Sequence, residues 1–290
     1  MNNAPLCAPP DPLPIRPQNR IPAGACDCHF HVSVGPSPLV PERSYTPPDL
    51  AITDYLNMRN VLGLSRGVIV QASPHGTDNR TTLAALPPDG SMRAVVVVNA
   101  QCSASELRAL ADQGAVGTRA NLLFPSNAQL DDLAGLARRI ADCGWHLQLL
   151  ADASKTEGLE ALVHLSPVPV VLDHMGHIPA RLGVSHPGFQ TVLRLLDTGK
   201  LWVKLSGAYR IAEPDYEDAA PMARALVSAN PGRLVWGSDW PHPAIKGPMP
   251  NDGALLDLLY DWADTETAKR ILVGNPEALY GFSQWEAKNG

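Results

Sequence analysis

The sequence lacks a long apolar run, a basic excess and a secretory leader, and each absence excludes a class of protein. No stretch of its 290 residues approaches eighteen consecutive apolar residues, so we expect no membrane span. The formal net charge of −6 argues against a nucleic-acid partner, because such a partner requires a clustered basic excess. The first residues contain no basic segment followed by an apolar one, so we expect no secretory signal.

Cysteines are also few. The five are scattered, and none has a neighbouring base in the sequence that would single it out as a nucleophile. Reduced thiols in a cytoplasmic protein are the simplest interpretation. No glycine-rich phosphate loop follows any apolar run, which argues against an open nucleotide-binding sheet.

Residues 1–24 hold seven prolines and little hydrophobic periodicity, so we expect an extended N-terminal arm. We expect residues 25–290 to form a single domain. Eight short apolar runs alternate there with segments of helical periodicity, which predicts a parallel sheet closed into a (β/α)8 TIM barrel. The predicted strands cover 25–32, 67–71, 92–98, 115–119, 146–150, 168–172, 201–205 and 233–236; the predicted helices cover 49–64, 80–86, 104–113, 130–143, 155–165, 187–197, 219–228 and 252–263, with a last helix and tail in 264–290.

The first predicted strand carries the pattern Asp-x-His-x-His. Alternation along a strand predicts that Asp27, His29 and His31 share one face, while Cys28 and Phe30 share the other. Two imidazoles on one face can converge on a metal ion or on a polarised carbonyl group. A pair of polar residues at a strand end remains an alternative until other strands supply partners.

The ends of the other predicted strands supply such polar partners. In barrels of this kind the catalytic residues gather at the carboxyl ends of the strands. For several of these residues a structural role remains an alternative, such as an Asx turn at Asp239 or a core histidine at His174. We expect His146, His164, His177 and His186 to be structural or surface residues. The strand-end candidates are Ser73, His75 and Asn79; Arg119; Asp173 and His174; Ser206, Tyr209 and Arg210; and Asp239 and His242.

These motifs resemble the amidohydrolase superfamily. The resemblance rests on Asp27-x-His29-x-His31, Asp173-His174-Met175-Gly176 and the segment from Trp236 to His242. The segments 42–47 and 70–79 and the pair Asn275-Pro276 are similar to the branch that contains 2-pyrone-4,6-dicarboxylate lactonase and D-galactarolactone isomerase. The similarity runs from about Pro22 to Tyr280.

The resemblance implies a hydrolase that opens the ring of a carboxylated lactone. Asp239 would be the general base toward water, and His29, His31 and His174 would polarise the carbonyl group. Arg119 and Arg210 could pair with a substrate carboxylate. The expected substrate-binding residues are Tyr45, Ser73, His75, Asn79, Arg119, Arg210 and His242.

The metal requirement stays open at this stage. His29, His31, His174 and Asp239 form a plausible Zn²⁺ set with three nitrogens and one oxygen. The resemblance nevertheless favours catalysis without metal, as in the two enzymes that define the branch. Thr118-Arg119-Ala120 also stands where binuclear members carry a carboxylated lysine.

Two departures widen the choice of substrate. Leu122-Leu123-Phe124-Pro125 stands where the lactonase has a second arginine, and Leu150 stands where it has a tyrosine. A lactone with one carboxylate or a sugar-acid lactone therefore fits as well as a pyrone dicarboxylate. Alternatives are a lactone isomerase, a Zn²⁺-dependent decarboxylase or hydrolase of the same superfamily, and a degenerate barrel that only binds a carboxylate. A homo-oligomer is also compatible with the sequence.

Overall fold

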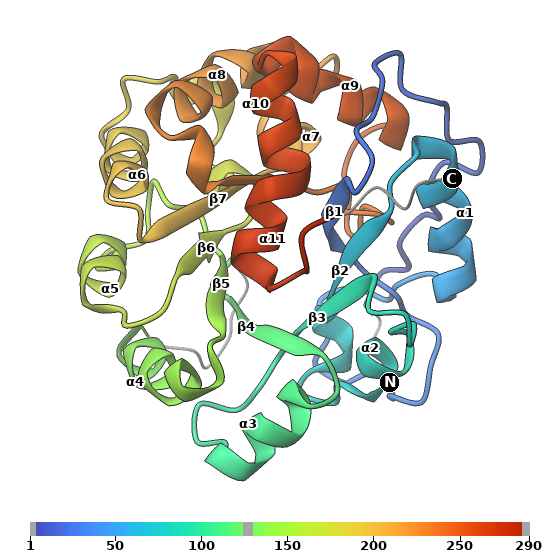
Figure 1. Ribbon diagram of the computed structural model, residues 1–290, viewed down its shortest axis with the longest axis vertical. Helices are drawn as coiled ribbons and strands as arrows, with labels where there is room; N and C mark the ends of the chain where they lie inside the picture. The colour runs from blue at the N-terminus through green and yellow to red at the C-terminus, as the bar shows by residue number, and fades with distance from the viewer. Residues whose placement is uncertain (1–3, 124–129, 286–290) are drawn as a thin grey trace.

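The computed structural model describes residues 4–123 and 130–285, and eight parallel strands form its centre (Figure 1). Each strand pairs in parallel with the next, in the order of the sequence. The strands are β1 (Cys26–Phe30), β2 (Arg66–Val70), β3 (Met92–Val96), β4 (Ala115–Asn121), β5 (His146–Leu150), β6 (Val170–Leu172), β7 (Leu201–Leu205) and β8 (Leu234–Trp236).

Helices surround the strands, as the ring in Figure 1 shows. The predicted barrel is confirmed, with most elements within a few residues of their expected bounds. The helices are α1 (Ile52–Leu62), α2 (Arg80–Ala84), α3 (Ala104–Ala111), α4 (Leu130–Ile140), α5 (Leu159–Leu165), α6 (Pro187–Asp197), α7 (Ala208–Ile211), α8 (Ala220–Ala229), α9 (Asp252–Trp262), α10 (Thr265–Lys269) and α11 (Asn275–Tyr280). None of the helices in the described residues is long and apolar enough to cross a membrane.

Contacts between the ends of β1 and β8 close the ring. Phe30 and Trp240 form a parallel bridge, and the His31 amide donates to the Trp240 carbonyl at 2.8 Å. The Asp239 amide likewise donates to the His29 carbonyl at 2.8 Å. Closure therefore places His29 and His31, at the carboxyl end of strand one, directly beside the aspartate after strand eight.

Two apolar clusters hold the barrel together. The larger contains strand residues such as Ile69 of β2 together with helix residues such as Leu107 of α3. The smaller combines strand residues such as Val68 and Val171 with Tyr280 of α11. The strands are near-continuous apolar runs in the sequence because both faces of each strand bury apolar side chains.

The first strand differs from the expected alternation. Its pairing with β2 is irregular between Asp27 and Phe30. Asp27 does not share the site with the two histidines: its carboxylate accepts hydrogen bonds from the Ser238 hydroxyl at 2.6 Å and from Tyr55 at 3.2 Å. Cys28 and Phe30 also fall into different apolar clusters. A shift in register changes which residues face the barrel interior, and the period of two cannot reveal it.

The proline-rich segment before β1 runs along the barrel. The Cys7 amide donates to the Thr46 carbonyl, and the Thr46 amide donates to the Pro5 carbonyl, both at 2.8 Å. Further along, the amides of Gln18 and Asn19 donate to the carboxylate of Asp257 in α9. Backbone pairing with the segment around Thr46 brings residues 5–8 to the mouth of the barrel.

Candidate active site

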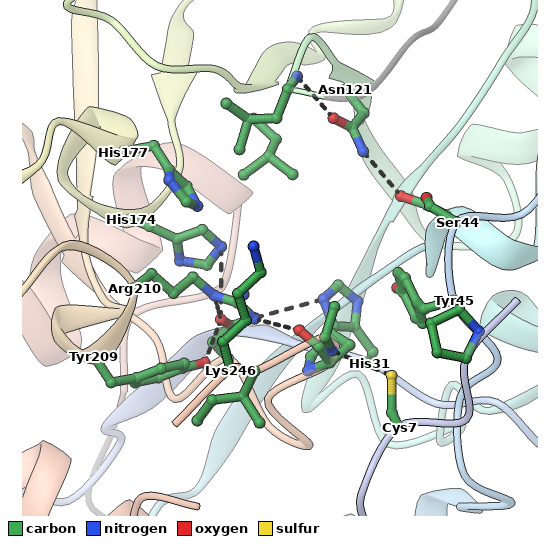
Figure 2. Close-up of a pocket in the computed structure, with 18 of the residues that line it drawn as sticks. Cys7, His31, Ser44, Tyr45, Asn121, His174, His177, Tyr209, Arg210 and Lys246 are labelled. Carbon is green, nitrogen blue, oxygen red and sulfur yellow. Dashed lines mark hydrogen bonds and ion pairs between the residues drawn. The ribbon is translucent and has the colours of Figure 1, made fainter. Parts of the chain in front are cut away.

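A cavity of about 600 Å³ opens at the carboxyl ends of the strands. Residues that follow or end seven of the eight strands reach it, and the N-terminal arm and the loop after β8 complete its wall (Figure 2). The lining residues are Pro5, Leu6, Cys7, Ala8, His31, Ser44, Tyr45, Ser73, Arg119, Asn121, Leu123, Leu150, His174, His177, Tyr209, Arg210, Asp239, Pro243, Ala244, Ile245 and Lys246.

Seven of the eleven residues predicted for the site line this cavity: His31, Tyr45, Ser73, Arg119, His174, Arg210 and Asp239. His29 is fully buried behind His31, with its Nε2 atom 3.3 Å from that of His31. Three predicted substrate contacts lie outside the lining. His75 is directed to the Pro38 carbonyl, Asn79 binds the backbone of Val97, and His242 is fully buried beside Tyr209.

Asp239 lies where the three site histidines converge. Its Oδ1 atom is 3.7 Å from His29 Nε2 and 3.6 Å from His31 Nε2, and its Oδ2 atom is 3.7 Å from His174 Nε2. Oδ1 has no hydrogen-bond partner among the described residues although it is buried. An acceptor oxygen is therefore free at the point where the imidazoles meet.

The other Asp239 oxygen is occupied. Oδ2 accepts hydrogen bonds from the Tyr209 hydroxyl at 2.6 Å and from Arg210 Nε at 2.5 Å. Burial alone would raise the pKa of Asp239, but the Arg210 guanidinium holds it well below its ordinary value. Arg210 also donates to the Pro243 carbonyl. The structure thus places Arg210 on the carboxylate of Asp239, whereas we expected it to bind a substrate carboxylate.

Burial keeps two of the histidines neutral. It lowers the pKa of His29 to about 3, with the nearby Lys204 ammonium acting in the same direction. It also lowers the pKa of His174 well below the ordinary value. His174 Nδ1 is 3.0 Å from the Ser206 hydroxyl, which can donate to it and leave the proton of the ring on Nε2, toward Asp239.

The backbone at the strand ends is unusual in a way that supports this geometry. Asp239 and His174 have φ angles of 65° and 50°, in the left-handed region that side chains other than glycine seldom adopt. Two glycines make room for the histidines. A Cβ atom on Gly207 would lie 2.9 Å from His174 Nδ1, and one on Gly237 would lie 2.7 Å from His29 Cβ. Strain of this kind concentrates at functional sites.

Below His29 lies a buried charged network that reaches the cavity at Arg119. Asp173 Oδ2 accepts hydrogen bonds from Arg119 Nε and from Gln148 Nε2, both at 3.0 Å. Lys204 Nζ lies 3.4 Å from Asp173 Oδ1 and donates to Gln148 Oε1 at 2.9 Å. The Gln148 amide therefore bridges an anion and a cation, and this fixes which end of the amide faces each of them.

Two cations remain available to a ligand in the cavity. Arg119 uses Nε for Asp173, and its Nη atoms make no hydrogen bond within the described residues. Lys246 has no hydrogen bond or ion pair within 4–123 and 130–285, and Figure 2 shows its side chain extending across the view between His174 and His31. The cavity therefore presents positive charge in a protein whose net charge is −6.

Sequence reasoning missed several of these residues. His177 lines the cavity, which corrects the expectation that it is structural or on the surface. Asn121 lies two residues after Arg119 and thus on the same face of β4, a signal that was present in the sequence. Lys204 interrupts the apolar run Leu-Trp-Val-Lys-Leu, and a lone charge within a buried strand was also readable. Lys246 follows no strand directly and left no such signal.

The donor atoms fit a metal ion by type and spacing. Ligand atoms of His29, His174 and Asp239 all lie within 4.8 Å of one another, and nitrogen and carboxylate oxygen are ordinary Zn²⁺ ligands. The partnerless Oδ1 atom of Asp239 is compatible with such an ion. Of the apolar substitutions noted in the sequence, Leu123 and Leu150 line the cavity, while Phe124 and Pro125 lie outside the described residues.

Comparison with curated proteins finds relatives across nearly the whole chain. A 2-pyrone-4,6-dicarboxylate hydrolase from Comamonas testosteroni is 37% identical over 285 residues, covering 92% of this chain and 93% of the relative. A 4-sulfomuconolactone hydrolase from Hydrogenophaga intermedia is 36% identical over 274 residues, covering 90% of each chain.

Solved structures show the same similarity. A probable 2-pyrone-4,6-dicarboxylic acid hydrolase from Acinetobacter baumannii, with citric acid bound, has a TM-score of 0.80 at 27% identity. The match covers 89% of this chain and all of that one. The family model described as amidohydrolase matches residues 26–282. The barrel, the strand-end histidines and aspartate, and these matches together show that the chain belongs to the amidohydrolase family.

Proposed function

We propose that this protein hydrolyses an anionic lactone and opens its ring to the free hydroxy acid. The observation that carries the proposal is the convergence of three imidazole Nε2 atoms on the Asp239 carboxylate, within 3.6 to 3.7 Å, at a cavity lined by free cations. The similarity to two lactone hydrolases over nine-tenths of the chain supports the same reaction.

Asp239 is the proposed general base. Its lowered pKa keeps it ionised at neutral pH, and Oδ1 is free to accept a proton from water. The oxygen of that water bonds to the lactone carbonyl carbon while its proton moves to Asp239. When the ring C–O bond breaks, the departing ring oxygen takes up the proton that Asp239 accepted, so Asp239 is again a carboxylate and the product is an acid and an alcohol within one open chain.

His29 and His174 are the proposed donors to the carbonyl oxygen. Each is neutral and can carry its proton on Nε2, so each can stabilise the oxyanion that forms when water adds. His31 differs from our expectation in this respect. Its Nδ1–H donates to the Val70 carbonyl at 2.8 Å, because a carbonyl can only accept, and its Nε2 in the neutral ring is therefore an acceptor.

The wall of the cavity favours a small anionic substrate. We propose that Arg119 and Lys246 bind a carboxylate or a group of similar charge, and that Tyr45 and Ser73 donate to the ring oxygens. Leu123 and Leu150 add apolar surface to the wall. This combination favours a lactone with one principal anionic group over one that requires several cations.

We also propose that catalysis needs no metal. If Zn²⁺ is bound, His29, His31, His174 and Asp239 would hold it, and the ion would supply Lewis-acid polarisation and a more acidic water. Further proposals follow from composition: the five free cysteines favour a cytoplasmic location, and the acidic net charge disfavours nucleic acid as a partner. Assembly into a homo-oligomer stays a prediction.

A lactone panel followed by NMR tests the reaction. The panel includes pyrone dicarboxylate, lactones with one carboxylate, sugar-acid lactones and their uncharged methyl esters. We expect an open hydroxy acid to accumulate from at least one anionic lactone, in protein dialysed against a chelator and shown to contain less than a stoichiometric amount of metal.

Other outcomes separate the alternatives. Conversion of one lactone ring into another without open acid would identify an isomerase. Release of carbon dioxide, lost on chelation and restored by Zn²⁺, would identify a metal-dependent decarboxylase. Binding of carboxylated ligands with no turnover across the panel would identify a degenerate binding barrel.

A further inference from the structure

A lysine that the proposed reaction does not use lies directly beneath the catalytic histidines. Lys204 is the fourth residue of β7, and none of its surface is exposed. Burying an ammonium is costly unless it is paired and fully hydrogen-bonded. The neighbouring Asp173 carboxylate, 3.4 Å away, supplies the opposite charge.

The three hydrogens of the ammonium have three acceptors. Lys204 Nζ is 2.9 Å from the Cys28 carbonyl oxygen, 2.9 Å from Gln148 Oε1 and 3.2 Å from His29 Nδ1. A lysine ammonium is only a donor. The third hydrogen bond therefore requires a lone pair on His29 Nδ1, which places the ring proton of His29 on Nε2.

The contact between His29 and His31 requires the same proton position on His29. His29 Nε2 is 3.3 Å from His31 Nε2, and His31 Nδ1 is 2.8 Å from the Val70 carbonyl oxygen. The carbonyl can only accept, so His31 holds its proton on Nδ1 and offers a lone pair at Nε2. A pure donor at one end and a pure acceptor at the other thus set one direction for every hydrogen bond from Lys204 through both histidines to Val70.

The competing arrangement is less well formed. His29 Nδ1 also lies 3.2 Å from Asp173 Oδ1, to which it could donate if the ring proton were on Nδ1. Asp173 Oδ1 has no hydrogen-bond partner among the described residues, so this pair approaches without hydrogen-bond geometry. The same arrangement would leave two Nε2 lone pairs facing each other at 3.3 Å, and the third hydrogen of Lys204 would have only the more distant Asp173 Oδ1, at 3.4 Å, to accept it.

We infer that Lys204 is a positioning residue that holds His29 in the tautomer with its proton on Nε2. The catalytic meaning of the inference rests on the proposed lactone hydrolysis, because only the Nε2–H form of His29 can donate to a carbonyl oxygen, which would take the place of His31 Nε2 as the acceptor. The same tautomer has a second consequence. The Nε2 atom of His29 carries a hydrogen and that of His31 accepts it, so Lys204 withholds both lone pairs from a metal ion.

Two variants test the inference. Lys204→Met removes the donor while keeping an unbranched side chain, and Lys200→Met removes an exposed lysine just before the same strand as the matched control. Histidine labelled with ¹⁵N reports which ring nitrogen carries the proton, and the His29→Gln spectrum identifies the His29 signals. Zinc affinity is measured by competition with a chromogenic chelator at neutral pH.

We expect His29 of the unaltered protein to carry its proton on Nε2. In Lys204→Met we expect the proton on Nδ1, toward Asp173, with Zn²⁺ affinity at least tenfold higher and kcat at least tenfold lower at little change in KM. Lys200→Met should match the unaltered protein in all three measurements. A proton on Nδ1 of His29 in the unaltered protein would overturn the inference, and that result does not depend on whether Lys204→Met folds.

An unchanged zinc affinity in folded Lys204→Met would also contradict the inference. The tautomer and the zinc affinity are measured without a lactone. If the lactone panel shows no turnover while both measurements come out as expected, the proposed reaction fails and the role of Lys204 in setting the tautomer stands.

Discussion

Replacing Asp239 with asparagine removes the proposed base and changes little else in the site. The residue has a φ of 65°, and asparagine tolerates the left-handed region better than most residues, so the backbone turn after β8 should persist. The amide has the shape of the carboxylate, and its oxygen can still accept from Tyr209 or Arg210. What it cannot do is take a proton from water.

The expected losses in rate and in stability follow from separate contacts. Loss of a general base lowers the rate by about 10² to 10⁴-fold, which corresponds to roughly 3–5 kcal/mol of the activation barrier. The folded state loses the ion pair with Arg210, whose side chain is 15% exposed while that of Asp239 is 1% exposed. Removing one partner of a buried pair costs about 3–5 kcal/mol, and we expect a value near the lower end because the amide oxygen keeps a hydrogen bond.

The assay is kcat/KM for a lactone that the panel identifies, together with the free energy of unfolding in urea. Asp112→Asn, at an exposed aspartate directly after α3, is the matched control and should leave both quantities unchanged. Activity within tenfold of the unaltered protein in folded Asp239→Asn would refute the assignment of Asp239 as base. A variant that loses activity only because it unfolds would be recognised from the urea curve.

Three further predictions concern charge. Because Arg210 holds the pKa of Asp239 well below its ordinary value, the rate should stay level as pH falls from neutrality toward the range in which an ordinary carboxyl group titrates, and Arg210→Met should move the acid limb of the kcat/KM profile to higher pH; an unmoved limb would exclude this role. Lys246→Met should raise KM for an anionic lactone by up to about fivefold, the range of an exposed ion pair, and leave KM for its methyl ester unchanged, so an equal effect on both substrates would contradict charge recognition. Burial raises the pKa of Asp27 to about 6, so its ionisation opposes folding, and the free energy of unfolding should fall by roughly 2 kcal/mol as pH rises from about 4 to 6. Asp27→Asn should remove this dependence in urea titrations across that range, and a slope equal to that of the unaltered protein would show that another group is responsible.

The barrel was readable from the sequence because its signal is local and repeated. Each buried parallel strand requires a short apolar run, and each following helix requires its own periodicity, so eight repeats indicate the topology without any knowledge of contacts. The same topology places every strand end at one mouth, which is why His31, His174, Arg119 and Asp239 were found as members of one site.

The contacts that these residues make join parts of the chain that are far apart in the sequence, so no local pattern predicted them. The role of Arg210 depends on α7, a four-residue helix that brings its guanidinium onto Asp239 rather than into the open cavity. The orientation of Asp27 depends on a register irregularity that leaves no mark in the pattern of residue types.

The sequence by itself determined the eightfold alternation, the family resemblance and the strand ends that carry the chemistry, since each of these follows from residues near one another in the chain. Only the tertiary structure decided which partners those residues have. Lys204 and Val70 belong to strands far apart in the sequence, yet together they set the direction of hydrogen bonding through His29 and His31. The proton position on an imidazole depends on the donors and acceptors around it, and closure of the barrel is what assembles them.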